Sequence, residues 1–337
     1  MSESGFKRHV ERCPMVWIIG RGVRESIVGL EEFVKIAGPL TVFPAVKSAA
    51  AACALVILFS GVLAAPRAEP LAGPQSAEQG ALRNQLWLLP SGQPGVLMRA
   101  TVFRPPGAGA FPLMVMNHGS TQNAARRLAL PTPEFAALSR WFVRHGYAVV
   151  VPQRPGHGET GGAYREDQGG CDDADFARAG AGAAESIAAA VSYMRAQPFV
   201  RRSGTIVSGQ SAGGWAALAF ASHAPGGVAA AINFAGGLGG RSFDRPGNNC
   251  APDRLIAAAE AFGRTSRIPT LWIYTENDSY FPPRLSRAMA DAFRSAGGKA
   301  DYRLLPPFGA EGHLMVESDN AEPVWGPVLE RFLATLR

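Results

Sequence analysis

The sequence predicts an α/β fold with a mainly parallel central sheet, helices on both faces of that sheet, and no large cap domain. From residue 96 onward, short apolar runs rich in Val, Ile and Leu alternate with longer segments of helical spacing, a pattern typical of a parallel sheet with crossover helices. A length of 337 residues, with 47% hydrophobic and 18% charged residues, is sufficient for one large core.

The expected strands are short apolar runs that end at polar or turn-forming residues. The run 112–117 has no polar alternation, which favours a strand buried on both faces. The expected strands are 96–103, 112–117, 147–152, 205–208, 228–234, 270–275 and 302–305.

The expected helices carry apolar residues three or four positions apart. In segment 132–145, Phe135, Leu138 and Trp141 follow this spacing. About 35 residues with one helix separate the fifth and sixth expected strands, which leaves no room for a large cap domain. The expected helices are 132–145, 174–195, 213–222, 253–262, 283–295 and 324–336.

The N-terminal region 1–65 is interpreted as a leader. Lys47 precedes an uncharged apolar run, 48–65, that ends in small residues, as in a secretory signal peptide. A membrane anchor is the alternative, because about 18 apolar residues just span a bilayer, and a buried helix is a third. The 46 residues ahead of Lys47 are unusual for a signal peptide, and a true translation start near Val42 or Val46 would account for them.

The rest of the chain divides in two. Residues 66–93 are rich in Pro, Gly, Ala and Gln and are expected to form a linker or arm, and 94–337 form the catalytic domain. A cleaved leader predicts a periplasmic or secreted protein. An uncleaved anchor would hold the catalytic domain at the membrane, outside the cytoplasm.

Charge and cysteine usage narrow the function further. The formal net charge of +6 is spread along the chain without clusters, so nucleic-acid binding is not indicated. No Cys-x-x-Cys or His/Cys cluster suggests a metal site, and we expect no cofactor. Beyond the leader only Cys171 and Cys250 remain, a disulfide candidate in an oxidising compartment; two unpaired thiols are the alternative.

The segment Gly209-Gln210-Ser211-Ala212-Gly213 lies between an expected strand and an expected helix. Gly-x-Ser-x-Gly in that context is typical of a sharp turn that exposes a nucleophilic serine. The two glycines remove side chains that would collide across the turn. Ser211 is therefore the candidate nucleophile, against the alternative of an ordinary glycine-rich turn.

A base and an acid are expected at the same edge of the sheet. His313 follows the last expected strand, and Asp278 lies in the turn after strand 270–275; loops after parallel strands meet at that edge. Glu276 is the backup acid. A solvent-exposed histidine and plain turn chemistry are the alternatives.

The oxyanion of an acyl-transfer intermediate also needs hydrogen-bond donors. We expect the backbone N–H groups of Ala212 and Ser120, the latter in the loop after strand 112–117. His118 in that loop is expected to have a structural role. Four aromatic residues near strand ends are candidates either for an acyl pocket or for the core: Phe234, Tyr280, Phe281 and Phe308.

These motifs together resemble the α/β-hydrolase family. They are His118-Gly119, the segment 154–162 (RPGHGETGG), Gly209–Gly213, Asp278 and His313, and the resemblance spans roughly residues 95–337. The nearest branch is that of dienelactone-hydrolase-like and prolyl-oligopeptidase-like serine esterases. Dienelactone hydrolases proper use a cysteine nucleophile where this chain has Ser211, so dienelactone chemistry itself is not expected.

The resemblance implies ester hydrolysis in two steps, acyl-enzyme formation and attack by water, without a cofactor. The sequence thus predicts an exported serine hydrolase that cleaves small-molecule carboxylic esters. A membrane is expected as a partner only if the leader is an uncleaved anchor. The alternatives are a serine peptidase acting on short peptides and a catalytically silent binding protein on a hydrolase scaffold.

Overall fold

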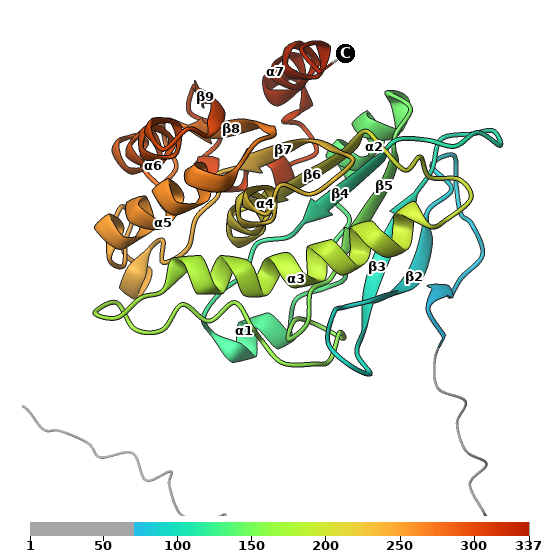
Figure 1. The fold of residues 1–337 in the computed structure, drawn as a ribbon, viewed down its shortest axis with the longest axis horizontal. Helices are drawn as coiled ribbons and strands as arrows, with labels where there is room; N and C mark the ends of the chain where they lie inside the picture. Colours follow the sequence, from blue (N-terminus) through green and yellow to red (C-terminus); the bar gives the residue numbers. More distant parts are fainter. Residues whose placement is uncertain (1–70, 337) are drawn as a thin grey trace, which may run out of the picture. The chain divides into compact units, whose positions relative to one another are not determined.

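One sheet of nine strands runs through the part of the chain that the computed structural model describes, residues 71–336 (Figure 1). The strand order is β1-β2-β3-β5-β4-β6-β7-β8-β9. β1, β2 and β3 are antiparallel to their neighbours. The remaining strands, β5, β4, β6, β7, β8 and β9, are parallel to one another. The strands are β1 Gly73–Pro74, β2 Gln85–Pro90, β3 Leu97–Phe103, β4 Leu113–Asn117, β5 Ala148–Pro152, β6 Thr205–Gln210, β7 Val228–Phe234, β8 Pro269–Thr275 and β9 Lys299–Leu305.

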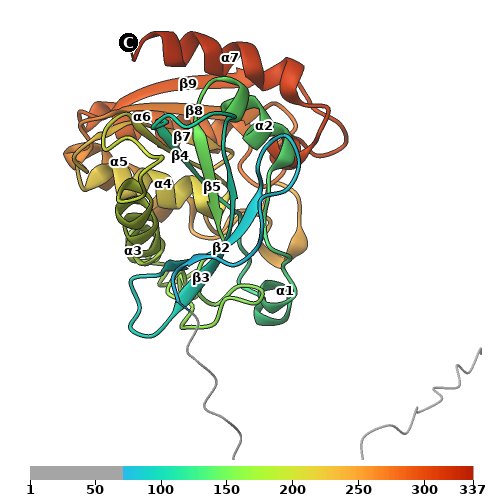
Figure 2. The same cartoon turned by 90° about the vertical axis from the view of Figure 1, so that its right-hand side faces the viewer.

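Helices cover both faces of this sheet (Figure 2). Buried residues of α3, α4, α5 and α6 share one core with one face of the sheet, and those of α2 and α7 share a second core with the other face. The helices are α1 Ala124–Leu128, α2 Ala136–Arg144, α3 Phe176–Arg195, α4 Ala212–Ser222, α5 Pro252–Thr265, α6 Pro283–Ser295 and α7 Glu322–Ala334, with short 3₁₀ turns η2 Ser242–Asp244 and η3 Gly312–Glu317. The predicted α/β architecture is confirmed.

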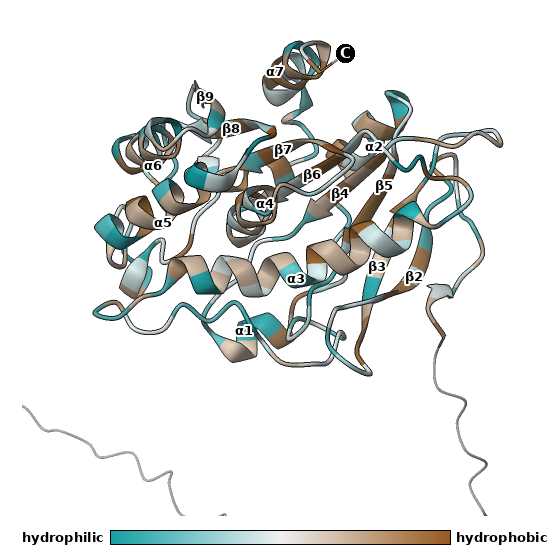
Figure 3. Ribbon diagram, viewed as in Figure 1, coloured by the Kyte–Doolittle hydropathy of each residue, from teal (hydrophilic) through white to brown (hydrophobic). Residues whose placement is uncertain are grey.

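The central strands are apolar because they are buried on both faces. In β4, Leu113 and Val115 belong to one core, whereas Met114 and Met116 belong to the other, as the period of two in a strand requires. Colouring by hydropathy shows the apolar residues concentrated in these central strands (Figure 3). Because the central strands are parallel, their carboxyl ends lie at one edge of the sheet. The loops that carry the candidate site begin at this edge.

Part of the expected linker belongs to the central sheet. Residues 85–90 form β2, which pairs along its whole length with β3, and Trp87 and Leu89 are buried. Within the expected linker or arm 66–93, this segment is therefore part of the sheet. The surrounding Pro, Gly and Gln residues obscured a short strand whose burial depends on its partner. The leader lies outside the described residues, and none of the described helices is long and apolar enough to cross a membrane.

Candidate active site

Ser211 lies at a sharp turn between the end of β6 and the start of α4. Its backbone angles are φ 55° and ψ −123°, which is a strained conformation for a residue with a side chain. The backbone N–H of Ser211 donates to the carbonyl of Phe234 at 3.0 Å, and its carbonyl accepts from Gly237 N at 3.2 Å. These bonds hold the turn to the loop after β7.

The glycines of the motif are required by close backbone packing. A Cβ atom on Gly209 would lie 2.2 Å from the carbonyl of Gly213, and one on Gly213 would lie 2.2 Å from the carbonyl oxygen of Asn117. Neither space accepts a side chain. Gly209 thus avoids a collision across the turn, as expected, whereas Gly213 is required by the close approach of the end of β4.

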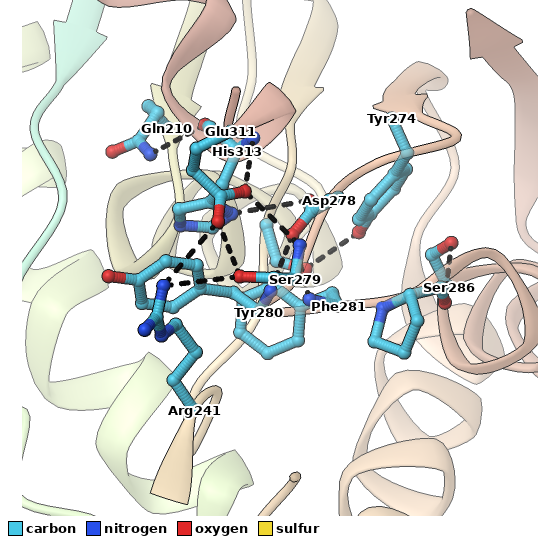
Figure 4. Close-up of polar contacts among 12 residues, drawn as sticks. Gln210, Arg241, Tyr274, Asp278, Ser279, Tyr280, Phe281, Ser286, Glu311 and His313 are labelled. Atoms are coloured by element: carbon cyan, nitrogen blue, oxygen red, sulfur yellow. Dashed lines mark hydrogen bonds and ion pairs between the residues drawn. The ribbon is translucent and has the colours of Figure 1, made fainter. Parts of the chain in front are cut away.

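His313 and Asp278 form a buried pair at the same edge of the sheet (Figure 4). The His313 Nδ1 atom is 3.2 Å from Asp278 Oδ2. The other carboxylate oxygen accepts from the backbone N–H groups of Tyr280 at 2.8 Å and Phe281 at 2.9 Å. Because a carboxylate oxygen accepts, this contact fits a hydrogen bond donated by Nδ1–H of His313, and Nε2 stays outside that bond.

Several neighbours hold His313 in place (Figure 4). Gln210 Nε2 donates to the His313 carbonyl at 3.1 Å, and the Tyr280 ring stacks on the imidazole with centroids 4.1 Å apart. Glu311 accepts from the backbone N–H groups of His313 and Ser279, each at 3.1 Å. Burial would raise the pKa of Glu311, but these hydrogen bonds and that of the Ser279 hydroxyl lower it overall.

Two cavities meet at Ser211. The first has a volume of about 510 Å³, and the second about 470 Å³. The first, here called the histidine-side cavity, is lined by Ser211, His313, Tyr280, Leu130, Pro131, Pro133, Phe135 and Leu314, among others. The second, the glycine-side cavity, is lined by Ser211, Ala212, Tyr280, Phe281, Gln168, Arg241, the glycine run 237–240 and others. Ser211 and His313 both line the histidine-side cavity. In the described part of the chain, residues 71–336, their side chains are not joined by a hydrogen bond.

The loop after β4 packs directly against the turn at Ser211. A Cβ atom on Gly119 would lie 2.4 Å from Gln210 Oε1 and 3.3 Å from Ser211 Cβ. Ser120 lines both cavities, and its hydroxyl is 2.7 Å from His157 Nε2. The backbone N–H groups of Ser120 and Ala212 stay the predicted oxyanion donors.

A buried ion pair between Arg154 and Glu166 supports the loop after β4. The fully buried guanidinium of Arg154 binds Glu166 through two nitrogens, at 2.5 and 2.9 Å, and donates to the His118 carbonyl at 2.7 Å. The Arg154 backbone N–H donates to His118 Nε2 at 3.0 Å, so His118 Nδ1–H donates to the Gly119 carbonyl at 2.6 Å. Both imidazole nitrogens are thus occupied by backbone groups, in agreement with the structural role expected for His118.

The electrostatics of this cluster follow from its burial. Burial, and then the charge of Arg154, hold the pKa of His118 well below its usual value, so this imidazole is neutral near pH 7. Burial would raise the pKa of Glu166, but Arg154 lowers it overall. The sequence analysis missed Glu166 and Glu311, because neither lies in a motif and each has a partner distant along the chain, Arg154 for Glu166 and Ser279 for Glu311.

The remaining predicted residues are two cysteines and four aromatic residues. Cys171 and Cys250 are joined by a disulfide with Cα atoms 5.0 Å apart, which confirms the predicted pair. Tyr280 and Phe281 line the glycine-side cavity. Phe234 and Phe308 instead belong to the core of α2 and α7. Within residues 71–336, no cluster of His, Cys, Asp and Glu is suited to a metal ion.

The strand order, the strained serine after a strand, and the paired histidine and aspartate define an α/β-hydrolase of the esterase and peptidase class. The chain belongs to the X-Pro dipeptidyl-peptidase (S15) family, whose model matches residues 94–262, half of the chain. No curated protein matches it in sequence.

Solved structures of similar fold include both esterases and peptidases. Acetyl xylan esterase 1 from Thermoanaerobacterium sp. JW/SL YS485 is 17% identical, with a TM-score of 0.53 over 78% of this chain and 88% of that one. Est1E from Butyrivibrio proteoclasticus, solved with ferulic acid, is 18% identical, with a TM-score of 0.51 over 73% and 98%. A puromycin-hydrolysing peptidase from Mycobacterium tuberculosis is 19% identical, with a TM-score of 0.52 over 78% of this chain and only 41% of that one.

Proposed function

We propose that this protein is an exported serine hydrolase that cleaves carboxylic esters through an acyl-enzyme on Ser211. The observation that carries the proposal is a serine in a strained turn that shares a cavity with His313, whose Nδ1 is paired with the buried Asp278. Because these three residues lie at the same edge of the sheet, each step of ester hydrolysis has a residue that can perform it.

The reaction has two halves. His313 Nε2 takes the Ser211 proton as Oγ bonds to the ester carbonyl carbon, and the oxyanion is held by the N–H groups of Ala212 and Ser120. As the C–O bond to the alcohol breaks, His313 returns the proton to the leaving oxygen. Water then attacks the acyl-enzyme with His313 as base, which releases the carboxylic acid and restores Ser211.

The two cavities divide the substrate between them. Because His313 must protonate the leaving oxygen, the alcohol belongs in the cavity that His313 lines, which is the histidine-side cavity. Its lining of Leu, Pro and Phe side chains suits an apolar alcohol. The acyl group is then directed away from His313, into the glycine-side cavity.

A peptidase is the second candidate, because the matching family model is that of an X-Pro dipeptidyl-peptidase. In an enzyme that releases dipeptides, the free ammonium of the substrate lies on the acyl side and requires carboxylate partners. The glycine-side cavity is lined instead by Arg126, Arg241 and one carboxylate, Asp244, which is 3.4 Å from Arg241. This charge arrangement favours an ester with a neutral or anionic acyl group.

Active-site labelling tests the proposal. A fluorophosphonate probe should label wild-type protein at Ser211, and p-nitrophenyl esters should be hydrolysed faster than aminoacyl p-nitroanilides. Ser211→Ala should abolish labelling and lower kcat by about 10³-fold or more, with an unchanged melting temperature. Ser222→Ala, at the far end of α4, is the matched control and should behave as wild type. Labelling that persists in Ser211→Ala would disprove the nucleophile assignment, and faster anilide cleavage would favour the peptidase.

Export is supported by the disulfide between Cys171 and Cys250, since disulfides persist in oxidising compartments. The alternative of an anchored protein with its catalytic domain outside the cytoplasm is compatible with the same bond.

A further inference from the structure

Gln168 is a buried polar side chain without an internal role. The residue is 4% exposed and lines the glycine-side cavity. Its Oε1 atom is buried and has no hydrogen-bond partner among residues 71–336. The Nε2 atom of the same carboxamide also makes no hydrogen bond in this part of the chain, and it is the donor that this cavity-lining side chain can offer to a substrate.

Gln153 is a second buried glutamine, and it has a structural role. Gln153, 1% exposed, donates through Nε2 to the carbonyls of Leu130 at 3.1 Å and Pro131 at 2.9 Å, and its Oε1 accepts from Glu159 N at 3.1 Å. Every part of that carboxamide is satisfied by the backbone. Gln168 has none of these contacts, although it is buried nearly as deeply.

The surroundings of Gln168 keep its carboxamide at the cavity wall. Gly239 has a φ of 73°, and a Cβ atom there would lie 3.2 Å from Gln168 Nε2 and 2.8 Å from the Cβ of Cys250. The amide therefore packs against the glycine run 237–240 and the disulfide. The Nε atom of Arg241, on the same cavity, is also buried without a partner.

Of the two arginines on this cavity, Arg126 is exposed to solvent, and Arg241 is compensated by two carboxylates. The guanidinium of Arg241 lies 3.4 Å from Asp244 and 3.6 Å from Glu311. Its charge is thus already compensated, while hydrogen-bonding capacity remains at Gln168. A neutral oxygen acceptor on the substrate matches this combination better than a carboxylate.

We propose that Gln168 is a specificity-determining residue that binds a second, neutral carbonyl oxygen in the acyl group of the substrate. The substrate class is that of esters of oxo- or amido-carboxylic acids, whose distal carbonyl accepts a hydrogen bond from Nε2 of Gln168. The inference rests on the proposed ester-hydrolase function and on the acyl group entering the glycine-side cavity.

Two matched substrate pairs test this inference. p-Nitrophenyl 4-oxopentanoate and pentanoate differ only in one oxygen, as do the 5-oxohexanoate and hexanoate. For each pair the readout is the ratio of kcat/KM for the oxo ester to that for the plain ester. In at least one pair, this ratio should be about tenfold higher for wild type than for Gln168→Leu, as expected for one hydrogen bond in a buried site.

Comparing the ratio between variants cancels the intrinsic reactivity of the oxo esters. Gln168→Glu keeps the shape but removes the N–H donor, and its ratio should fall to that of the leucine variant. Gln197→Leu, on the loop after α3, is the matched control and should keep the wild-type ratio.

Stability separates recognition from a structural role. Gln168→Leu removes an unpaired amide, so its melting temperature should be equal to or above that of wild type. In contrast, Gln153→Leu breaks several buried hydrogen bonds and should lower it by several degrees. A ratio unchanged in Gln168→Leu for both pairs, or a clear loss of stability in that variant, would overturn the inference. If wild type cleaves none of the four esters, the ester-hydrolase function itself fails, which is distinct from equal ratios in an active enzyme.

Discussion

Ser211 has a backbone conformation that few residues with a side chain adopt. A strained φ and ψ pair costs about 1–3 kcal/mol and persists only where neighbouring contacts impose it. Here the imposing contacts are the hydrogen bonds to Phe234 and Gly237, together with glycines that admit the close approach of β6, α4 and the loop after β4. The turn places the hydroxyl at the wall shared by both cavities.

Asp278 and Glu276 provide a matched pair of acids in one turn. Asp278 is buried and contacts His313 Nδ1, whereas Glu276 is exposed. Asp278→Asn should lower kcat by about 10³–10⁴-fold, because an amide neither fixes the imidazole tautomer nor stabilises its cation. Glu276→Gln should stay within about twofold of wild type. Steady-state kinetics on p-nitrophenyl esters measures both, and equal, mild effects would contradict the assignment of Asp278.

His157 couples stability to pH. Burial lowers its pKa below the usual value of about 6.5, with Arg154 acting in the same direction and Glu166 opposing it. Below pH 6.5 the unfolded chain binds a proton at this histidine before the folded chain does. The free energy of unfolding should therefore fall between pH 7 and pH 5, by up to about 1.4 kcal/mol per pH unit from this group.

His157→Asn removes that contribution. Urea unfolding from pH 5 to pH 8 should show a shallower pH dependence in the variant than in wild type, whatever the change in stability at pH 8. His223→Asn, at the exposed end of α4, serves as the control and should keep the wild-type slope. Parallel curves for wild type and His157→Asn would show that His157 does not titrate as its burial implies.

At the scale of elements, the site depends on which strands are neighbours. β4 and β6 pair in parallel, with Asn117 opposite Gly209, so the loop after β4 and the turn after β6 leave the sheet side by side. β7 and β8 follow in order, which places the loop of Asp278 on the other side of Ser211. Two loops far apart in sequence are then joined by the disulfide.

The disulfide ties two walls of the glycine-side cavity, both cysteines being among its lining residues. It closes a loop of 79 residues in sequence, and the chain-entropy relation gives a stabilisation of about 4 kcal/mol. The double variant Cys171→Ser/Cys250→Ser should unfold at a lower temperature and show a larger rise in KM than fall in kcat, because the proposed triad lies on other loops. Reduced wild-type protein should behave likewise. Two free thiols in denatured, unreduced protein would refute the bond.

At the scale of the whole molecule, the described domain and the leader make separate contributions. The domain carries the candidate site, and we propose that residues 1–65 act as a leader that directs where the protein acts. Export should give a mature N-terminus near Pro66 or Glu69, because the apolar run 48–65 ends there in small residues. N-terminal sequencing of protein from the periplasm or medium measures this. A membrane-bound product that retains residues upstream of Ser48 would favour the anchor.

Local patterns in the sequence determined the order of the central strands and helices and the residues of the candidate triad. Ser211, Asp278 and His313 each follow a strand, and parallel strands deliver such residues to one edge whatever the details of packing. The same reasoning gave no strand at β2, because a short strand flanked by Pro, Gly and Gln has little signal of its own and is stabilised by pairing with β3.

Only the tertiary structure decided how the site is supported and divided. Glu311 reaches Ser279, 32 residues away, and the pair of Arg154 and Glu166 holds a loop that begins 36 residues before the arginine. Likewise, only the folded chain shows that the carboxamide of Gln168 is unpaired and lies near Gly239 and Cys250. Side chains of this kind lack a local signature, because their energies arise from burial and from partners that the folded chain alone brings within reach.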